Sequence, residues 1–405
     1  MADEGGTDSQ AEEFEYFFSG NVKYNDEPLE GVSIAVSGGG FEAETETDEN
    51  GQWTIGVPEK EGTYELTLDE DTLPEGVVVE DGQSTVEAEF GLTNRKAVNF
   101  FLGEGQRVTT DYGAQVLIRV VNGLNFGLLL ALAAIGLSLI FGTTGLSNFA
   151  HAEMITFGAL MMLTFSTTLG FPVWLAILIA IALSAGLGWT LDAALWKPLR
   201  RRGVALIPLM IVSIGLSLAL RYTYQFFYGG GTRQLPGATL PREIQLGPIL
   251  LSWIDVASMA TSVIVLLAVA YFLLRTRIGK ATRAVSDNAP LAAASGIDVD
   301  RVIRIVWVLG GGLAGLSGIL WAYFRPGVSW DMGFQILLLV FAAVTLGGLG
   351  TAFGALVGSL IVGLFIEVST LWLPSDMKYV GALLVLILVL LFRPQGILGR
   401  RERIG

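Results

Sequence analysis

The chain has 405 residues, of which 52% are hydrophobic and only 16% are charged. A soluble protein normally carries about a quarter charged residues, so this composition argues against an ordinary soluble protein. The chain has no cysteine, which excludes disulfides, cysteine-ligated zinc and cysteine nucleophiles.

The charges divide the chain into two parts. Residues 1–105 hold 26 acidic and 4 basic side chains, whereas residues 106–405 hold 12 and 21. A net charge that changes from −22 to +9 predicts a domain boundary near residue 105. The strong acidity of the first part is typical of proteins that work in high salt, where self-repulsion is screened; a simple acidic, soluble domain is the alternative. The same charge disfavours binding to nucleic acid.

Short alternating segments predict an all-β domain over residues 14–105, after a flexible acidic N-terminus at 1–13. Seven strands separated by turn residues indicate a sandwich of two antiparallel sheets. The acidic stretch 41–51 has two interpretations, a cation site or a solvated face. The order of G-N-V, P-L-E-G-V-S-I-A-V, T-D-E-N-G-Q-W and Y-E-L-T-L over residues 17–102 resembles the transthyretin-like, carboxypeptidase-regulatory sandwich, which is structural or adhesive. The predicted core residues are Trp53, Ile55, Tyr64, Leu66 and Leu68.

Apolar segments of nearly spanning length recur after a predicted linker at 106–123. Because a helix needs about 20 apolar residues to cross the hydrocarbon, we expect a polytopic α-helical membrane domain over 124–395. Several segments are short, so the expected number of spans is eight or nine, some of them broken or re-entrant. The candidate spans are 124–141, 152–169, 172–195, 205–228, 249–274, 302–324, 333–348, 353–372 and 379–392.

Basic residues predict the orientation of these spans. The segments 197–202 and 275–283 and the basic tail at 396–405 should lie in the cytoplasm. Alternation then places the β domain outside the cell membrane, although no signal peptide precedes it. Either the start of the chain lies upstream, or the first span carries its N-terminus across. If one segment does not span, the domain is cytoplasmic instead.

Sequence motifs exclude several activities. No G-x-x-x-x-G-K-[ST] phosphate loop occurs, so we expect no ATP hydrolysis by this chain and no bound cofactor. A single histidine, His151, cannot form a conventional metal site without cysteines. Asn148 is placed to cap the helix that follows it. Glycines at 350, 354 and 358 repeat every four residues, which favours close helix packing over direct substrate contact.

Four motifs occur in an order that resembles a known family. The segment 275–304 runs R-x-x-x-G-x-A-x-R-A, then A-x-x-x-G-I and D-R-V-I, and its small residues could fit the groove of a partner. The stretch G-L-S-N-F-A-H-A-E, the run LGGLGTAFGALVG and the ending RPQGILGR accompany it. Together they resemble the branched-chain amino acid permeases (LivH type) of ATP-binding-cassette importers, over about residues 120–403. Ala152 replaces the glycine that usually follows the histidine, and the family lacks the β domain.

The resemblance implies a membrane subunit that is not itself an enzyme. Its expected partners are a second, LivM-type permease subunit, two cytoplasmic ATPases that use ATP and magnesium, an external substrate-binding protein and the lipid bilayer. The cargo would be branched-chain or other amino acids, or else urea and short amides. The implied residues of the ATPase-coupling loop are Arg283, Ala292, Ala293, Ser295, Gly296 and Asp300. Candidates for the pathway or for a hinge are Gly145, Asn148, His151, Glu153, Gly350, Gly354 and Glu367.

Two other classes remain as alternatives. An ion-coupled secondary transporter needs a charge inside the membrane, for which Asp192 and Glu367 are candidates. A membrane-anchored receptor or adhesion protein would explain the β domain, but it would need neither eight spans nor a coupling-type loop.

Overall fold

The computed structural model describes residues 14–104, 112–373 and 395–399 with short gaps inside the first two ranges, and single positions between 377 and 391. The gaps fall at 25–26, 39, 61–62, 75–76, 80–83, 91–93, 99, 238–242, 247–248 and 326. The predicted acidic N-terminus and most of the candidate span 379–392 lie outside the described residues. The chain separates into two compact units, Met1–Thr109 and Thr110–Gly405, which are described in turn.

The first unit is a sandwich of two β-sheets. One sheet has the strand order β4-β3-β6-β8, and the other has the order β2-β1-β10-β7 with β5 and β9 also paired to β1. The strands are β1 (Tyr16–Tyr24), β2 (Glu27–Pro28), β3 (Ser33–Gly38), β4 (Phe41–Glu46), β5 (Gln52–Val57), β6 (Tyr64–Leu68), β7 (Val77–Val79), β8 (Thr85–Ala88), β9 (Arg95–Ala97) and β10 (Phe100–Glu104).

The core of the sandwich confirms the alternation in the sequence. Every predicted core residue from Trp53 to Leu68 is at most 3% exposed, and residues of both sheets form one apolar cluster. The prediction of two antiparallel sheets was wrong for one of them, because β1 pairs in parallel with β9 and β10. Parallel neighbours need a long crossover, and here the chain between them builds the opposite sheet.

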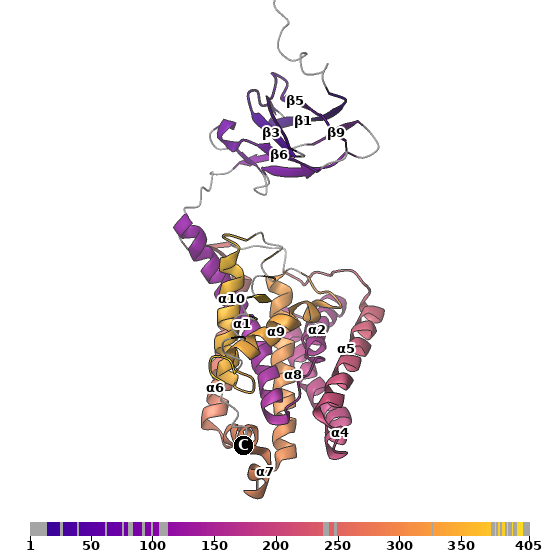
Figure 1. Cartoon of the computed structure of the whole chain (residues 1–405), viewed down its shortest axis with the longest axis vertical. Coiled ribbons are helices and arrows are strands. Elements are labelled where there is room, and N and C mark those ends of the chain that lie inside the picture. The colour runs from indigo at the N-terminus through magenta and orange to yellow at the C-terminus, as the bar shows by residue number, and fades with distance from the viewer. Residues whose placement is uncertain are drawn as a thin grey trace, which may run out of the picture. The chain divides into compact units, whose positions relative to one another are not determined.

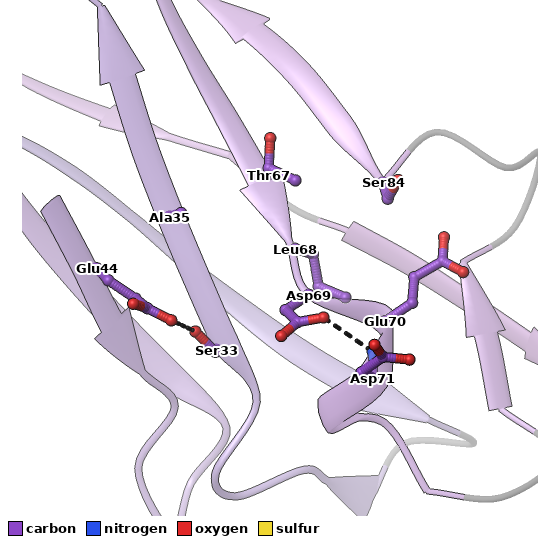
Figure 2. Close-up of a pocket in the computed structure, with 9 residues that line it drawn as sticks. All are labelled: Ser33, Ala35, Glu44, Thr67, Leu68, Asp69, Glu70, Asp71 and Ser84. Atoms are coloured by element: carbon purple, nitrogen blue, oxygen red, sulfur yellow. Dashed lines mark hydrogen bonds between the residues drawn. The ribbon is translucent and has the colours of Figure 1, made fainter. Parts of the chain in front are cut away.

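An open hollow on the sandwich gathers acidic side chains. It measures about 510 Å³ and is bordered by Glu44, which accepts a hydrogen bond from Ser33, and by Asp69 and Asp71 (Figure 2). The carboxylate of Asp69 accepts the backbone N–H of Asp71 and so shapes its own turn. Among the described residues, no group of three or more acidic or histidine side chains is placed to hold a metal ion.

Helices form the second unit, with one hairpin of β11 (Glu243–Leu246) and β12 (Ile249–Ser252). Six helices are long and apolar enough to cross a membrane, counted among the described residues. The predicted polytopic helical fold is thus confirmed. The helices are α1 (Tyr112–Thr144), α2 (His151–Leu163), α3 (Val173–Leu191), α4 (Lys197–Arg201), α5 (Leu206–Tyr228), α6 (Trp253–Arg275), α7 (Arg277–Ala294), α8 (Val299–Phe324), α9 (Met332–Gly347) and α10 (Ala352–Ser369).

Several helices differ from simple spans. Helix α1 begins at Tyr112, twelve residues before the predicted first span, so much of the predicted linker is helical. Helix α3 continues through the π-helical turn Asp192–Trp196 into α4, and α2 continues into the π-helical turn Thr164–Thr168. Helix α9 has only 16 residues, about 24 Å of helix, which is too short to cross the hydrocarbon alone.

Glycines bring the central helices into close contact. Helix α8 lies between α1, α2 and α3 (Figure 1). A methyl group added to Gly158 of α2 would lie 2.3 Å from Gly315 of α8, and one added to Gly310 would lie 3.2 Å from the carbonyl of Gly136 in α1. In lipid, where tails are as apolar as side chains, such close packing is a main source of helix association.

Candidate functional site

The chain between α1 and α2 is not helical, although it lies inside the helical unit. Gly145 has a positive φ of 71° and lies beside Leu206 at the start of α5. Six residues later, the Nε2 atom of His151 lies 3.0 Å from the carbonyl oxygen of Ala133 in α1. Ala133 precedes the last residue of α1 by eleven positions, about 16 Å along the helix. The segment therefore turns back into the bundle, and α2 begins deep inside it.

The motif runs from one end of the bundle into its interior. Its first part lies at the end that carries α4 and α7, where Gly142 is beside Ser286 of α7 (Figure 1). The residues before α2 lie against α5, with Gly145 beside Leu206 and Phe149 bonded to Ser213. The motif thus forms a broken span, as some segments were predicted to do.

Side chains satisfy the backbone of this break. The N–H of Phe149 donates to Ser213 of α5, and the N–H of Ala150 donates to the Asn148 side chain. Asn148 therefore stabilises the turn before α2, but it is not the cap of the helix, since Ala150 holds that position and makes no side-chain cap bond. An unsatisfied backbone group in the hydrocarbon would cost several kcal/mol, so these bonds are a condition for the break.

Glu153 forms a buried ion pair one turn into α2. Its side chain is fully buried, and its Oε1 accepts bonds from Nε and Nη2 of Arg221 at 3.1 and 3.0 Å. Ser217 donates to the same oxygen at 2.9 Å. The pair ties the start of α2 to α5 across 68 positions of sequence.

Aromatic side chains of α9 and its neighbours cover the ion pair. The Arg221 guanidinium lies 3.7 Å from the ring centre of Phe334, a cation–π contact. Trp330, just before α9, stacks on Tyr222 of α5. Gly333 donates its backbone N–H to Thr156 of α2. The first turn of α9 therefore closes over the first turn of α2.

A second charged cluster lies at the end that carries α4. Asp192 is fully buried and accepts a bond from Arg200 at 2.6 Å through Oδ1 and from Arg304 at 3.5 Å through Oδ2. Asp300 at the start of α8 binds Lys197 at 2.9 Å and Arg201 at 3.2 Å. These bonds hold α4 against α8, which makes Asp300 a positioning residue for that end of the bundle.

The segment after α6 forms two helices that meet at a kink within α7. Asn288 has φ −161° and ψ 95°, the extended backbone of a residue that caps the start of a new helix. The Asn288 side chain accepts the N–H of Leu291, and the short second helix ends before Gly296 at φ 85°. Leu291 is 64% exposed at its tip. The second helix packs back on the first and on α8 through Val285, Ala292 and Val302.

Comparisons with known proteins cover the helical unit. The family model for "Branched-chain amino acid transport system / permease component" matches residues 119–391. The chain belongs to this family of permeases. The β domain lies before the matched residues. No solved structure matches the chain.

Several relatives agree with the family match. The permease is 31% identical over 305 residues to the high-affinity branched-chain amino acid transport system permease protein LivH of Salmonella typhimurium. The match covers 71% of this chain and 96% of the relative. It is 32% identical to BraD of Pseudomonas aeruginosa, with the same shares. The ribose import permease protein RbsC of Escherichia coli is 28% identical, over 58% of this chain and 72% of the relative. The permease is accordingly a transport component and not an enzyme.

The predicted site residues of the permease fall into separate groups. Gly145, Asn148, His151 and Glu153 form the break, and Gly350 packs against Gly142 at its edge. Gly354 instead packs against Gly347 between α9 and α10, and Glu367 lies 4.0 Å from Arg119 near the start of α1. Of the coupling-loop residues, Ala292 is buried in the kinked segment, whereas Arg283, Ala293, Ser295 and Gly296 are exposed.

Sequence reasoning missed two residues of these groups, Arg221 and Leu291. Arg221 received no role, although an arginine within an apolar span is costly unless it is paired, and that cost was a usable signal. Leu291 was passed over beside the small residues, since only its exposure on the folded helix distinguishes it.

Proposed function

We propose that the permease moves branched-chain amino acids across the cell membrane as one membrane subunit of an ATP-binding-cassette importer. The observation that carries the proposal is the match of the whole helical unit to relatives named as branched-chain amino acid permeases. Energy would come from ATP and magnesium used by two separate cytoplasmic subunits. A LivM-type permease subunit and an external binding protein would complete the importer.

The exposed tip of the kinked α7 segment is the proposed contact with an ATPase. The tip presents Leu291 beside the small exposed residues Ala293 and Ser295, which form a narrow apolar projection. Its base packs on α8, and α8 also binds α4 through Asp300. A push on the tip can therefore reach the central helix directly. ATP can shift the permease between two conformations only through contacts that differ between them.

The basic residues of the helical unit also support an orientation in the membrane. The basic helices α4 and α7 lie at one end of the bundle (Figure 1), which we assign to the cytoplasm. The N-terminal sandwich would then lie outside the cell membrane, where it could contact the binding protein or the cell envelope.

The ion-coupled alternative has less support. Asp192 is bonded to two arginines, one at each oxygen, so its charge is already compensated within the protein. Glu367 lies near Arg119 at the start of α1 rather than in the break.

Uptake of radiolabelled leucine by the reconstituted importer tests the proposal. Leu291→Ala should lower ATP-driven uptake about fivefold or more, because truncating a central anchor typically costs more than 1 kcal/mol of binding. Lys280→Ala, an exposed truncation before the kink, is the matched control and should leave uptake unchanged. Equal uptake by both variants would refute the coupling contact, and ATP-independent uptake by the unaltered complex would refute the transporter class.

A further inference from the structure

Two fully buried carboxylates of the helical unit differ in one respect. Both oxygens of Asp192 accept a bond from an arginine. In Glu153, Oε1 accepts all three bonds from Arg221 and Ser217, and Oε2 is buried without a hydrogen-bond partner among the described residues. A buried carboxylate oxygen without a donor is costly, which makes Oε2 a candidate acceptor for a donor supplied from outside the chain.

The partner of Glu153 also has unused capacity. Arg221 donates through Nε and Nη2, to Glu153 and Ser217, and no described residue accepts a bond from its Nη1. A guanidinium offers five N–H donors, and its planar fork suits a carboxylate. The ion pair thus presents one free anionic acceptor and one free cationic donor.

An aromatic side chain and two glycines of the α9 region border the Glu153–Arg221 pair. Phe334 lies over the guanidinium from the first turn of α9 and is itself 49% exposed. Glycines with positive φ flank α9, Gly327 before it at 145° and Gly348 after it at 113°. These are positions where the backbone can turn without the strain that a side chain imposes. Movement of α9 would uncover Arg221 and Glu153 together.

We propose that the Glu153–Arg221 pair recognises the charged groups of the cargo, with Glu153 Oε2 accepting from the α-ammonium and Arg221 Nη1 donating to the α-carboxylate. This rests on the proposed function and deepens it, since it names the zwitterionic α-amino acid as the recognised class. In this structure the pair is closed, with Arg221 covered by Phe334. The two charges of the cargo alternate with those of the protein, so no net charge is added at this depth of the bundle.

The same geometry separates amino acids from uncharged cargo. Urea and short amides carry hydrogen-bonding groups but no full charges, so they leave the ionic capacity of the pair unmatched. A site with buried charged groups discriminates strongly against a ligand that cannot pair them. The pair is thus a specificity determinant placed at the broken start of α2.

The test is a double replacement that removes both charges, Glu153→Gln with Arg221→Gln, in the complete importer. Removing one partner of a buried pair is strongly destabilising, whereas removing both leaves no unpaired charge, and two glutamines can still hydrogen-bond to each other. The double variant should therefore co-purify with its partner subunits as the unaltered permease does. Its leucine uptake should nevertheless fall about 10- to 100-fold, as expected when hydrogen bonds to charged groups are lost.

Different outcomes of this experiment would overturn the recognition role of the pair or the proposed function. A double variant that takes up leucine at the unaltered rate would overturn the recognition role and leave the pair as a structural bond. If the double variant does not assemble, Arg221→Lys keeps the charge and removes the planar fork, and it should raise the KM for leucine; an unchanged KM would overturn the proposal. Asp192→Asn with Arg200→Gln removes both members of the other buried pair, and as the matched control it should leave the KM for leucine unchanged. Uptake of urea and of no amino acid by the unaltered complex would instead refute the proposed function itself.

Discussion

The contact between Gly158 and Gly315 gives the sharpest prediction about stability. In Gly158→Ala the new methyl group would lie 2.3 Å from the backbone of Gly315, whereas carbon atoms pack at about 3.5 Å, so α2 and α8 must separate by about 1 Å. The obstacle is backbone and cannot rotate away, which places the cost near the upper end of the overpacking range, about 3 kcal/mol. The better helix propensity of alanine returns about 1 kcal/mol. The net expected loss is about 2 kcal/mol.

A control variant isolates the clash from the change in propensity. Gly186 in α3 has no heavy atom within 4 Å of an added methyl group, so Gly186→Ala gains only the propensity. The assay is the temperature at which half of the detergent-solubilised permease remains monodisperse in size-exclusion chromatography. We expect this temperature to fall for Gly158→Ala and to stay equal or rise for Gly186→Ala. Equal temperatures for the two variants would refute the close packing of α2 on α8.

Three further predictions concern other parts of the chain. In Gly296→Ala the added methyl group meets no atom within 4 Å, but the alanine must adopt φ 85°, so the strain should cost only about 1 kcal/mol. Leucine uptake should therefore fall without being abolished, and complete loss of uptake would contradict an effect of strain alone. Asp192→Asn leaves Arg200 and Arg304 without a charged partner and should lower the thermal midpoint by chromatography more than Asp300→Asn does, because Asp300 is half-exposed. Trp53→Ala removes a side chain that is 3% exposed and should cost about 3–5 kcal/mol in the sandwich, seen as faster proteolysis within residues 14–104; resistance equal to the unaltered chain would contradict its place in the core.

Local sequence patterns were sufficient to predict which segments form strands and helices, but not which elements pair or pack together. Alternation in Tyr64–Leu68 predicted a strand with its core face, since side chains on successive residues point to opposite sides of a sheet. The same alternation could not tell that β1 pairs in parallel with β9 and β10, because pairing depends on a connection through the other sheet. Apolar length likewise predicted the spans and left the depth of α2 open.

The candidate site shows the same limit. The motif around His151 was found from the sequence, and its polar residues indicated something other than a plain span. The bond from Glu153 to Arg221 joins residues in different helices, so no local pattern contains it. At the α7 segment the small residues were found from the sequence, but only the fold shows that Ala292 is buried while Leu291 is exposed. The family resemblance identified the coupling loop, whereas the packing of the fold determines which of its side chains are exposed to a partner.

The broken second span also links the placement of α2 to that of α5. Helix α2 with its π-helical turn is not among the segments that are long and apolar enough to cross a membrane, and it carries a carboxylate whose cation lies 68 residues further along the chain. Glu153 lies in the first turn of α2, and its carboxylate has its ion-pair partner only when α5 is in place. A buried charge without a partner is costly, so the final position of α2 depends on that of α5.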